Sequence, residues 1–204
     1  MAPDAVQLEI IEVILGNLPL DNPLAMKFAG QYTLVKDVRN ALKLVKEAGL
    51  TPNKLRALIQ YNLAYIDSIE PELVAAAEPR LSAKQLPVLQ TAVHNLPADE
   101  VRANLSPLSS LYDVLVESLD FAITQDEQAG KTAQTSTWKR RFVQTIDSVR
   151  GMHDERKRNN WWLLISNVYE KYREQIHSRG YYDYAAILWE LIQQHAQSCR
   201  QRAT

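Results

Sequence analysis

Residues 159–188 constrain the fold most, because they combine a long helical pattern with a stop and a restart. Large apolar side chains recur there at spacings of three and four, which is the period of an amphipathic α-helix. Gly180 follows the last apolar position and suits the left-handed conformation that ends many helices. Asp183 then stands where an N-cap is expected, ahead of a second apolar run. The stretch therefore predicts two helices joined by a tight turn.

The rest of the chain repeats this helical pattern. Thr51-Pro52 and Ser106-Pro107 each place a capping hydroxyl before a proline at the first helical position. β-branched residues are scattered rather than alternating, which disfavours strands. We therefore predict an all-α protein, an irregular multi-helix bundle of about seven to nine helices that forms a single domain over residues 1–204.

The helical periodicity and the turn signals give approximate boundaries. Residues 128–137 are the most polar, turn-rich segment and are expected to form a mobile loop, and the tail at 197–204 is expected to fray. Glu70-Pro71 is expected to interrupt one helix, since proline removes a backbone donor. Other helices are expected at 4–16, 33–48, 52–69, 83–96, 106–127 and 138–152.

Composition limits the compartment and the chemistry. The single cysteine, Cys199, excludes an internal disulfide framework and fits a reducing compartment. No apolar run approaches membrane-spanning length, so no membrane partner is predicted. We expect a cytoplasmic protein, with a monomer as the simplest state.

No active site is predicted from the sequence. Gly130-Lys131-Thr132 matches the end of a phosphate-binding loop, but Gln125 stands where that loop needs its first glycine. The segment before it has a helical rather than a strand pattern. The 4 histidines are scattered, with no partner at metal-ligand spacing. We therefore predict no catalytic residue, no metal site and no cofactor in this chain.

Charge is unevenly distributed along the chain. Residues 131–204 carry 13 Lys or Arg and 7 Asp or Glu, a net +6, whereas residues 1–130 have a net −7. Basic residues interleaved with aromatic ones can hold a phosphate backbone and stack bases. Two basic triplets lie near tryptophans, and adjacent tryptophans cannot share one buried face fully. Trp138 and one of Trp161 and Trp162 are expected in the core. The predicted DNA-binding residues are Lys139, Arg140, Arg141, Arg156, Lys157, Arg158 and Trp161.

Several segments occur in an order that resembles a known family. They are a Pro-Leu loop near Leu18, Ala48-Gly-Leu-Thr-Pro, Thr137-Trp-Lys-Arg, and the tyrosine-rich helix that leads to Asp183-Tyr184. This order is similar to the accessory 1B subdomain of UvrD/PcrA/AddA-type superfamily 1 DNA helicases. The resemblance implies a DNA-binding accessory domain for unwinding, repair or recombination, with Asp183 and Tyr184 at the junction to the motor domains. It also implies that ATP and Mg²⁺ bind the parent motor, outside this segment.

An alternative belongs to another functional class. The acidic first half and a tryptophan outside the core would equally serve an all-helical protein–protein interaction adaptor with no nucleic-acid role. Salt dependence separates the two hypotheses, because phosphate contacts weaken steeply with salt.

Overall fold

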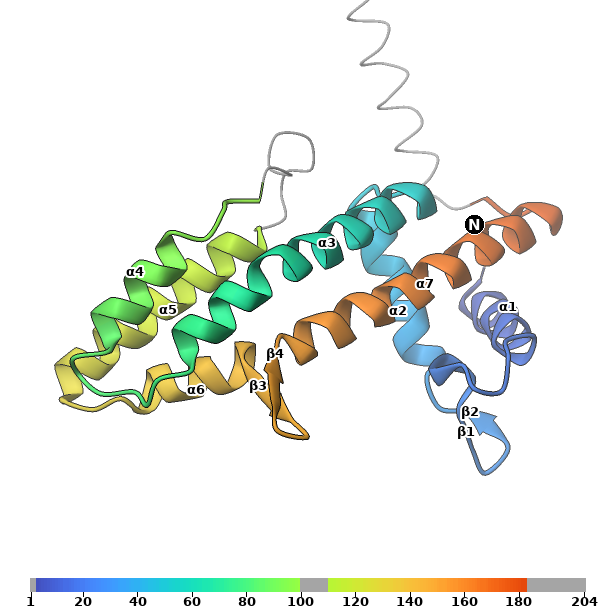
Figure 1. The fold of residues 1–204 in the computed structure, drawn as a ribbon. Coiled ribbons are helices and arrows are strands. Elements are labelled where there is room, and N and C mark those ends of the chain that lie inside the picture. Colours follow the sequence, from blue (N-terminus) through green and yellow to red (C-terminus); the bar gives the residue numbers. More distant parts are fainter. Residues whose placement is uncertain (1–2, 100–109, 183–204) are drawn as a thin grey trace, which may run out of the picture. The chain divides into compact units, whose positions relative to one another are not determined.

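The computed structural model describes residues 3–99 and 110–182 and is dominated by helices (Figure 1). Within these residues it has seven α-helices, one short 3-10 helix and two two-stranded antiparallel hairpins. The all-α fold class and the predicted number of helices are thereby confirmed for the described residues. The elements are α1 (Asp4–Gly16), η1 (Pro23–Ala25), β1 (Lys27–Phe28), β2 (Gln31–Tyr32), α2 (Val35–Glu47), α3 (Pro52–Ala77), α4 (Leu86–His94), α5 (Leu111–Ala129), α6 (Ala133–Phe142), β3 (Gln144–Ile146), β4 (Val149–Gly151) and α7 (His153–Ser178).

The chain divides into two compact units, where the sequence predicted one domain. The terminal unit comprises Met1–Ile59 and Trp161–Thr204, and the central unit comprises Gln60–Asn160. Both boundaries fall within helices, α3 and α7. Each unit has its own apolar interior.

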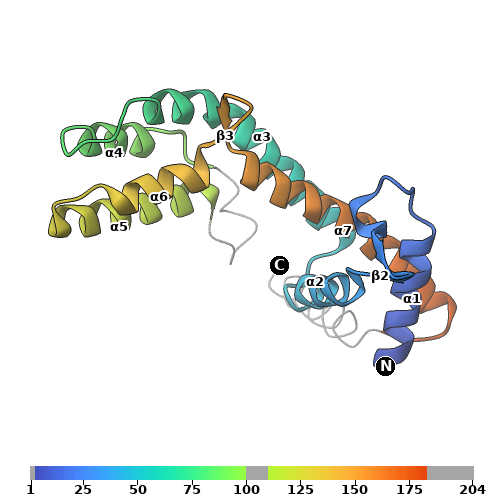
Figure 2. The ribbon, with the colours of Figure 1, turned by 90° about the horizontal axis from the view of Figure 1, so that it is seen from below.

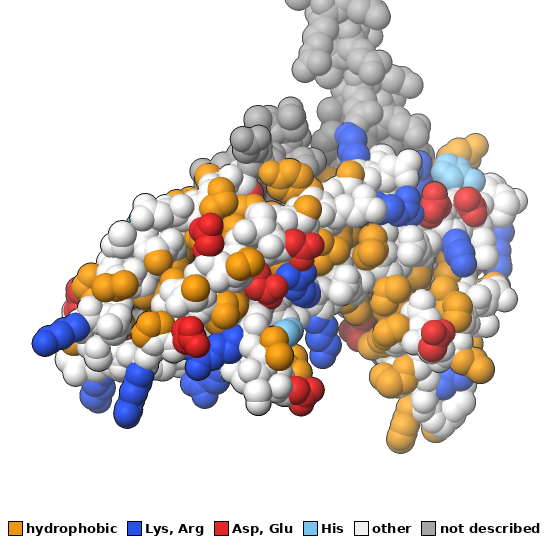
Figure 3. All heavy atoms as spheres, in the orientation of Figure 1, with side chains coloured by type: hydrophobic (Ala, Val, Ile, Leu, Met, Phe, Trp, Pro, Cys, Tyr) orange, Lys and Arg blue, Asp and Glu red, His pale blue; other side chains and the backbone are white. Residues whose placement is uncertain are grey.

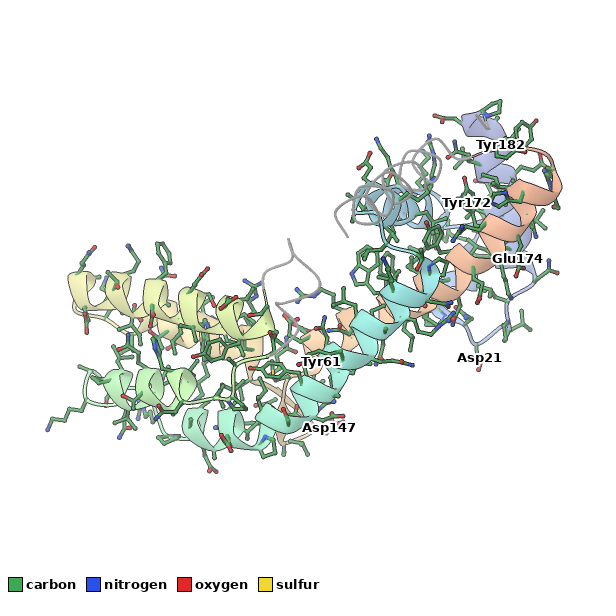
Figure 4. The ribbon with its side chains drawn as sticks, turned by 90° about the horizontal axis from the view of Figure 1, so that it is seen from above. Asp21, Tyr61, Asp147, Tyr172, Glu174 and Tyr182 are labelled. Carbon is green, nitrogen blue, oxygen red and sulfur yellow. The ribbon has the colours of Figure 1, made fainter. Side chains whose placement is uncertain are left out.

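In the terminal unit, α1 and α2 pack together, and the first part of α3 and the later part of α7 contribute further buried apolar side chains. Lys46 Nζ of α2 lies 5.2 Å from the ring centre of the buried Tyr172 on α7 (Figure 4). Arg56 of α3 donates to Asn167 and Glu170 of α7. The largest fully buried side chains here are those of Tyr172, Ile10, Ile11, Ile14, Leu15, Leu24 and Leu42.

In the central unit, α5 lies beside both α4 and α6 (Figures 1 and 2). One apolar cluster fills the unit and includes Trp138, Phe142 and Met152. Its helical members recur at three- and four-residue spacings, as expected for core-facing stripes. They include Ile66, Ile69 and Leu73 of α3, Leu86, Leu89 and Val93 of α4, and Leu111, Leu115 and Leu119 of α5.

Several predicted helix ends are confirmed. Thr51 Oγ1 accepts a hydrogen bond from the Lys54 amide at 3.2 Å, and Pro52 begins α3. Gly180 has φ +72° after α7, and the Tyr181 amide bonds back to the Ile176 carbonyl. These signals act within a few residues, so the sequence alone predicts them.

Proline 71 does not interrupt the helix as predicted. The helix α3 continues from Pro52 to Ala77 with Pro71 inside it. Pro71 is exposed, whereas Ile69, Leu73 and Ala77 are buried on the same helix. Burial of this stripe against the central core offsets the loss of one backbone hydrogen bond.

Within the described residues, the helix predicted over 106–127 corresponds to α5, which runs from Leu111 to Ala129. Ser110 caps α5 by accepting a hydrogen bond from the Asp113 amide at 3.1 Å. The predicted start at Ser106-Pro107 lies outside the described residues. Likewise, the fraying tail at 197–204 lies outside them.

The predicted loop at 128–137 is mostly helical. Ala129 ends α5, Gly130 adopts φ +62°, and α6 begins at Ala133, so only three residues connect the helices. Polar composition suggested a loop, but Thr135 in this segment is fully buried. The Thr135 amide donates a hydrogen bond to the buried Asp126 carboxylate of α5.

The helical stripe predicted over 138–152 is wrong beyond Phe142. Residues 144–151 form the β3–β4 hairpin, with Asp147 at its tip (Figure 4). Asp147 and Ser148 both have positive φ, +46° and +69°. Two such residues form the tight turn that suits a hairpin. Ile146 and Val149, which fall within the predicted helix, are exposed on the strands.

Candidate nucleic-acid interface

The position of α6 is fixed by a buried carboxylate. Asp126, near the end of α5, is 1% exposed and accepts hydrogen bonds from the amides of Gln134 at 2.9 Å and Thr135 at 2.8 Å. Burial disfavours its charged form, but these donors outweigh burial and hold the pKa of Asp126 below its usual value. The side chain thus replaces an N-cap and ties α6 to α5.

The inner face of α6 is aromatic. Trp138 and Phe142 are buried, with ring centres 5.2 Å apart. The Trp138 Nε1–H donates to Ser118 Oγ of α5 at 3.0 Å. The prediction that Trp138 belongs to the core is confirmed. Because that face is occupied, the three basic residues after Trp138 are distributed around the rest of the helix.

The first basic triplet divides into one tethered and two solvated side chains. Lys139 is half-buried, and its Nζ donates to the Pro79 carbonyl at 3.1 Å. Arg140 and Arg141 are exposed. The Arg141 guanidinium lies 4.9 Å from the ring centre of Phe142, which restrains it without neutralising its charge. Neither arginine pairs with a carboxylate of the described residues.

Arg156 from the second triplet has a structural role in the central unit. Its guanidinium pairs with Asp67 and Glu70 of α3. The other Glu70 oxygen accepts the Met152 amide at 2.6 Å. The hydrogen bond to Glu70 is the main cause that raises the Arg156 pKa. For Glu70, burial favours the neutral form, but the bonds from Arg156 and Met152 prevail and lower its pKa. Two carboxylates therefore already occupy Arg156, and its capacity to bind a phosphate is reduced.

Lys157 and Arg158 are exposed on the first turns of α7. Arg158 pairs with Glu155, whose side chain is 4% exposed, while 54% of the Arg158 side chain remains accessible. Lys157 has no hydrogen bond or ion pair within the described part of the chain. Lys157 is thus the most available cation of the second triplet.

Trp161 belongs to the terminal unit rather than to the unit that carries the triplets. It is half-buried and meets Trp162 edge to face, with ring centres 5.1 Å apart. The sequence predicts that one of the two tryptophans lies in the core and the other outside it. In the structure both are half-buried, so this prediction is wrong. Asp183 and Tyr184, the predicted junction to motor domains, lie outside the described residues.

Two further cations, Arg80 and Arg150, were not among the predicted site residues. Together with Lys139 they line an open pocket of about 480 Å³ in the central unit. Arg150 falls within the helix that the sequence predicts over residues 138–152. It lies on β4 instead, where its Nη1 donates to the Glu78 carbonyl at 3.0 Å. Sequence offers no signal for this grouping, because it depends on a hairpin that was not predicted.

Cationic side chains gather on one side of this unit. Figure 3 shows Lys and Arg along the lower edge of the visible face, in the region of α6 and the β3–β4 hairpin. Such a concentration attracts polyanions by long-range electrostatics.

In the described ranges, no group of three His, Cys, Asp or Glu residues could hold a metal ion. None of the helices described is both long and apolar enough to cross a membrane.

Comparison with known proteins found no matching protein-family model, no matching curated protein and no matching solved structure. The likeness to helicase accessory subdomains therefore rests on the sequence segments alone.

Proposed function

We propose that the central unit binds DNA through the phosphate backbone. The proposal rests on the exposure and the unpaired charge of Arg140, Arg141 and Lys157 in the part of the chain described. All three are exposed, and none is paired with a carboxylate in the described residues. Solvated cations of this kind can exchange small counterions for phosphates, which supplies most sequence-independent affinity.

The same geometry favours backbone contacts over base reading. Direct reading of bases requires donors and acceptors held in a fixed arrangement within a groove. Arg140 has only a 3.4 Å contact to Thr137 within its own helix, and Lys157 has no polar partner among the described residues. Flexible cations position a nucleic acid but carry no sequence information.

On the sequence resemblance, we further propose that this DNA binding serves a UvrD-like superfamily 1 helicase or helicase-nuclease. The chain would be the accessory domain that guides DNA, and the motor domains of the parent protein would be its partners. ATP and Mg²⁺ would act in those motor domains. The protein would be cytoplasmic and function as a monomer.

The experiment that tests DNA binding compares charge reversals in the two units. The double variant Arg140→Glu/Arg141→Glu should weaken binding to the same extent for unrelated DNA sequences, measured by fluorescence anisotropy. The matched control, Lys36→Glu/Lys43→Glu, reverses two exposed cations of α2 and changes the net charge equally. Circular dichroism should show both variants folded. Equal weakening by both variants would mean that net charge, not this surface, controls binding.

An adaptor function is supported by a different surface. In the terminal unit Leu20 is 102% exposed, Met26 57% and Phe28 78%. All three belong to the connection between α1 and α2, and a contiguous patch of exposed apolar side chains marks a protein interface. The adaptor hypothesis predicts no salt-sensitive binding to DNA, even at about 50 mM salt, where phosphate contacts are strong.

A further inference from the structure

The pocket lined by Arg80, Lys139 and Arg150 is formed where the segment 78–81 that follows α3, helix α6 and strand β4 meet. We call it the cationic pocket. Its cations come from three separate segments of the central unit, and its volume is about 480 Å³. The remaining lining residues are Glu78, Leu81, Thr132 and Ser136.

Two of the cations are held in place by uncharged acceptors. Lys139 Nζ donates to the Pro79 carbonyl at 3.1 Å, and Arg150 Nη1 donates to the Glu78 carbonyl at 3.0 Å. The two carbonyls orient the Lys139 and Arg150 side chains. In return, the side chains supply hydrogen-bond donors to backbone carbonyls that follow the C-terminus of α3. The carbonyls carry no net charge, so they do not neutralise the positive charges of Lys139 and Arg150.

The pocket has an excess of positive charge. Three cations face it, against the single carboxylate of Glu78. No ion pair within the described residues joins Glu78 to any of them. Burial, and secondly the nearby Arg150, lower the pKa of Lys139, as expected for cations brought together without an anion between them.

We propose that the cationic pocket binds a phosphate group. Guanidinium groups from Arg80 and Arg150 provide planar pairs of donors suited to phosphate oxygens, and Lys139 adds a third positive donor. Thr132 adds a hydroxyl group at the start of α6, whereas the Ser136 hydroxyl already donates to the Thr132 carbonyl at 2.6 Å and lines the pocket without a free proton. The open form of the pocket admits either a terminal phosphate of a DNA strand or a phosphodiester within it. That the phosphate belongs to DNA rests on the proposed function, whereas the phosphate site itself does not.

Inorganic phosphate is the direct probe. In ¹H–¹⁵N spectra of the full chain, phosphate should cause saturable shifts at Thr132, Ser136 and Arg150. Sodium chloride at equal ionic strength should not reproduce them. Arg80→Gln removes one charged donor and should lower phosphate affinity about tenfold, the effect expected for one charge-assisted hydrogen bond.

Arg80 suits this test because it is exposed and has no hydrogen bond or ion pair in the part of the chain described. Lys139→Gln, at the more buried cation, provides a second variant. The matched control is Lys84→Gln, which removes a nearby exposed cation outside the pocket and should leave phosphate affinity unchanged. Shifts that do not saturate, shifts that chloride reproduces, or equal losses from Arg80→Gln and Lys84→Gln would overturn the proposal.

Oligonucleotides identify the source of the phosphate. Stronger binding of a 5′-phosphorylated strand than of its unphosphorylated copy, lost in Arg80→Gln, supports a terminal phosphate. Equal binding of both strands, reduced in Arg80→Gln, supports an internal phosphodiester. If inorganic phosphate binds as described and neither strand binds, the phosphate site stands and the proposed DNA-binding function is refuted.

Discussion

Substitution of Arg156 by glutamine tests whether this residue serves the fold rather than DNA. The sequence places it in a basic triplet, but the structure pairs it with Asp67 and Glu70. Lys157, the next residue, is exposed and has no polar partner among the residues described. Lys157→Gln is therefore a matched control that removes the same charge one position away.

The expected cost follows from what each partner loses. The Glu70 side chain is only 23% exposed, so loss of its charged partner should cost about 1.5–3 kcal/mol. The Asp67 side chain is 65% exposed, and its pair should add at most about 1 kcal/mol. We expect Arg156→Gln to reduce the free energy of unfolding by about 2–3 kcal/mol, and Lys157→Gln to change it by less than about 0.5 kcal/mol.

Urea denaturation followed by circular dichroism measures this difference. With a urea dependence of about 2 kcal/mol per molar, the midpoint of the transition should fall by about 1 M in Arg156→Gln. DNA binding at neutral pH should fall more in Lys157→Gln than in Arg156→Gln, once both are measured at a temperature where both are folded.

The effect should also depend on pH in one direction. The pKa of folded Glu70 lies below its ordinary value of 4.5, so its ionised form contributes stability that is fully present above pH 4.5. That contribution is lost as pH falls through the lower pKa of the folded state. The gap in stability between wild type and Arg156→Gln should therefore narrow in acid. An Arg156→Gln variant as stable as wild type, but with weaker DNA binding, would refute the structural role of this residue.

Two further substitutions test the local contacts that build the central unit. Asp126→Asn should lower the free energy of unfolding by about 2 kcal/mol, because an amide cannot accept from both the Gln134 and Thr135 amides as the carboxylate does. The control is Glu127→Gln at the exposed neighbouring residue, and equal urea midpoints for the two variants would contradict the capping role. Gly151→Ala should cost about 1–3 kcal/mol, because its new methyl group would lie 2.6 Å from Glu70 Oε1. Gly16→Ala, whose methyl group would lie 3.1 Å from the Tyr32 hydroxyl oxygen and 3.9 Å from Tyr32 Cζ, should cost less. Similar thermal midpoints for the two alanine variants would count against the contact with Glu70.

Short segments that determine their own conformation are predictable from the sequence. The Thr51-Pro52 start and the Gly180 stop each depend on backbone chemistry within a few residues. The helical pattern likewise predicted that Trp138 belongs to the core, which its burial on α6 confirms.

Segments whose conformation depends on residues far away in the sequence are not predictable in this way. Apolar residues after Phe142 continue the helical spacing, yet the turn at Asp147 and Ser148 places them on a hairpin. The polar start of α6 reads as a loop unless Asp126 is known to cap it from the preceding helix. The basic triplet containing Arg156 looked uniform because its partners on α3 lie more than eighty residues earlier. Such contacts leave no local pattern.

The salt dependence of DNA binding tests the central proposal most directly. About three to six phosphate contacts predict a slope of roughly −3 to −5 for the logarithm of the association constant against the logarithm of salt concentration. Binding should have a dissociation constant on the order of micromolar or weaker at physiological salt. Arg140→Glu/Arg141→Glu should make the slope shallower by about 2, since two contacts are removed. A slope near zero, or a slope left unchanged by this double reversal in a folded protein, would contradict DNA binding by this surface.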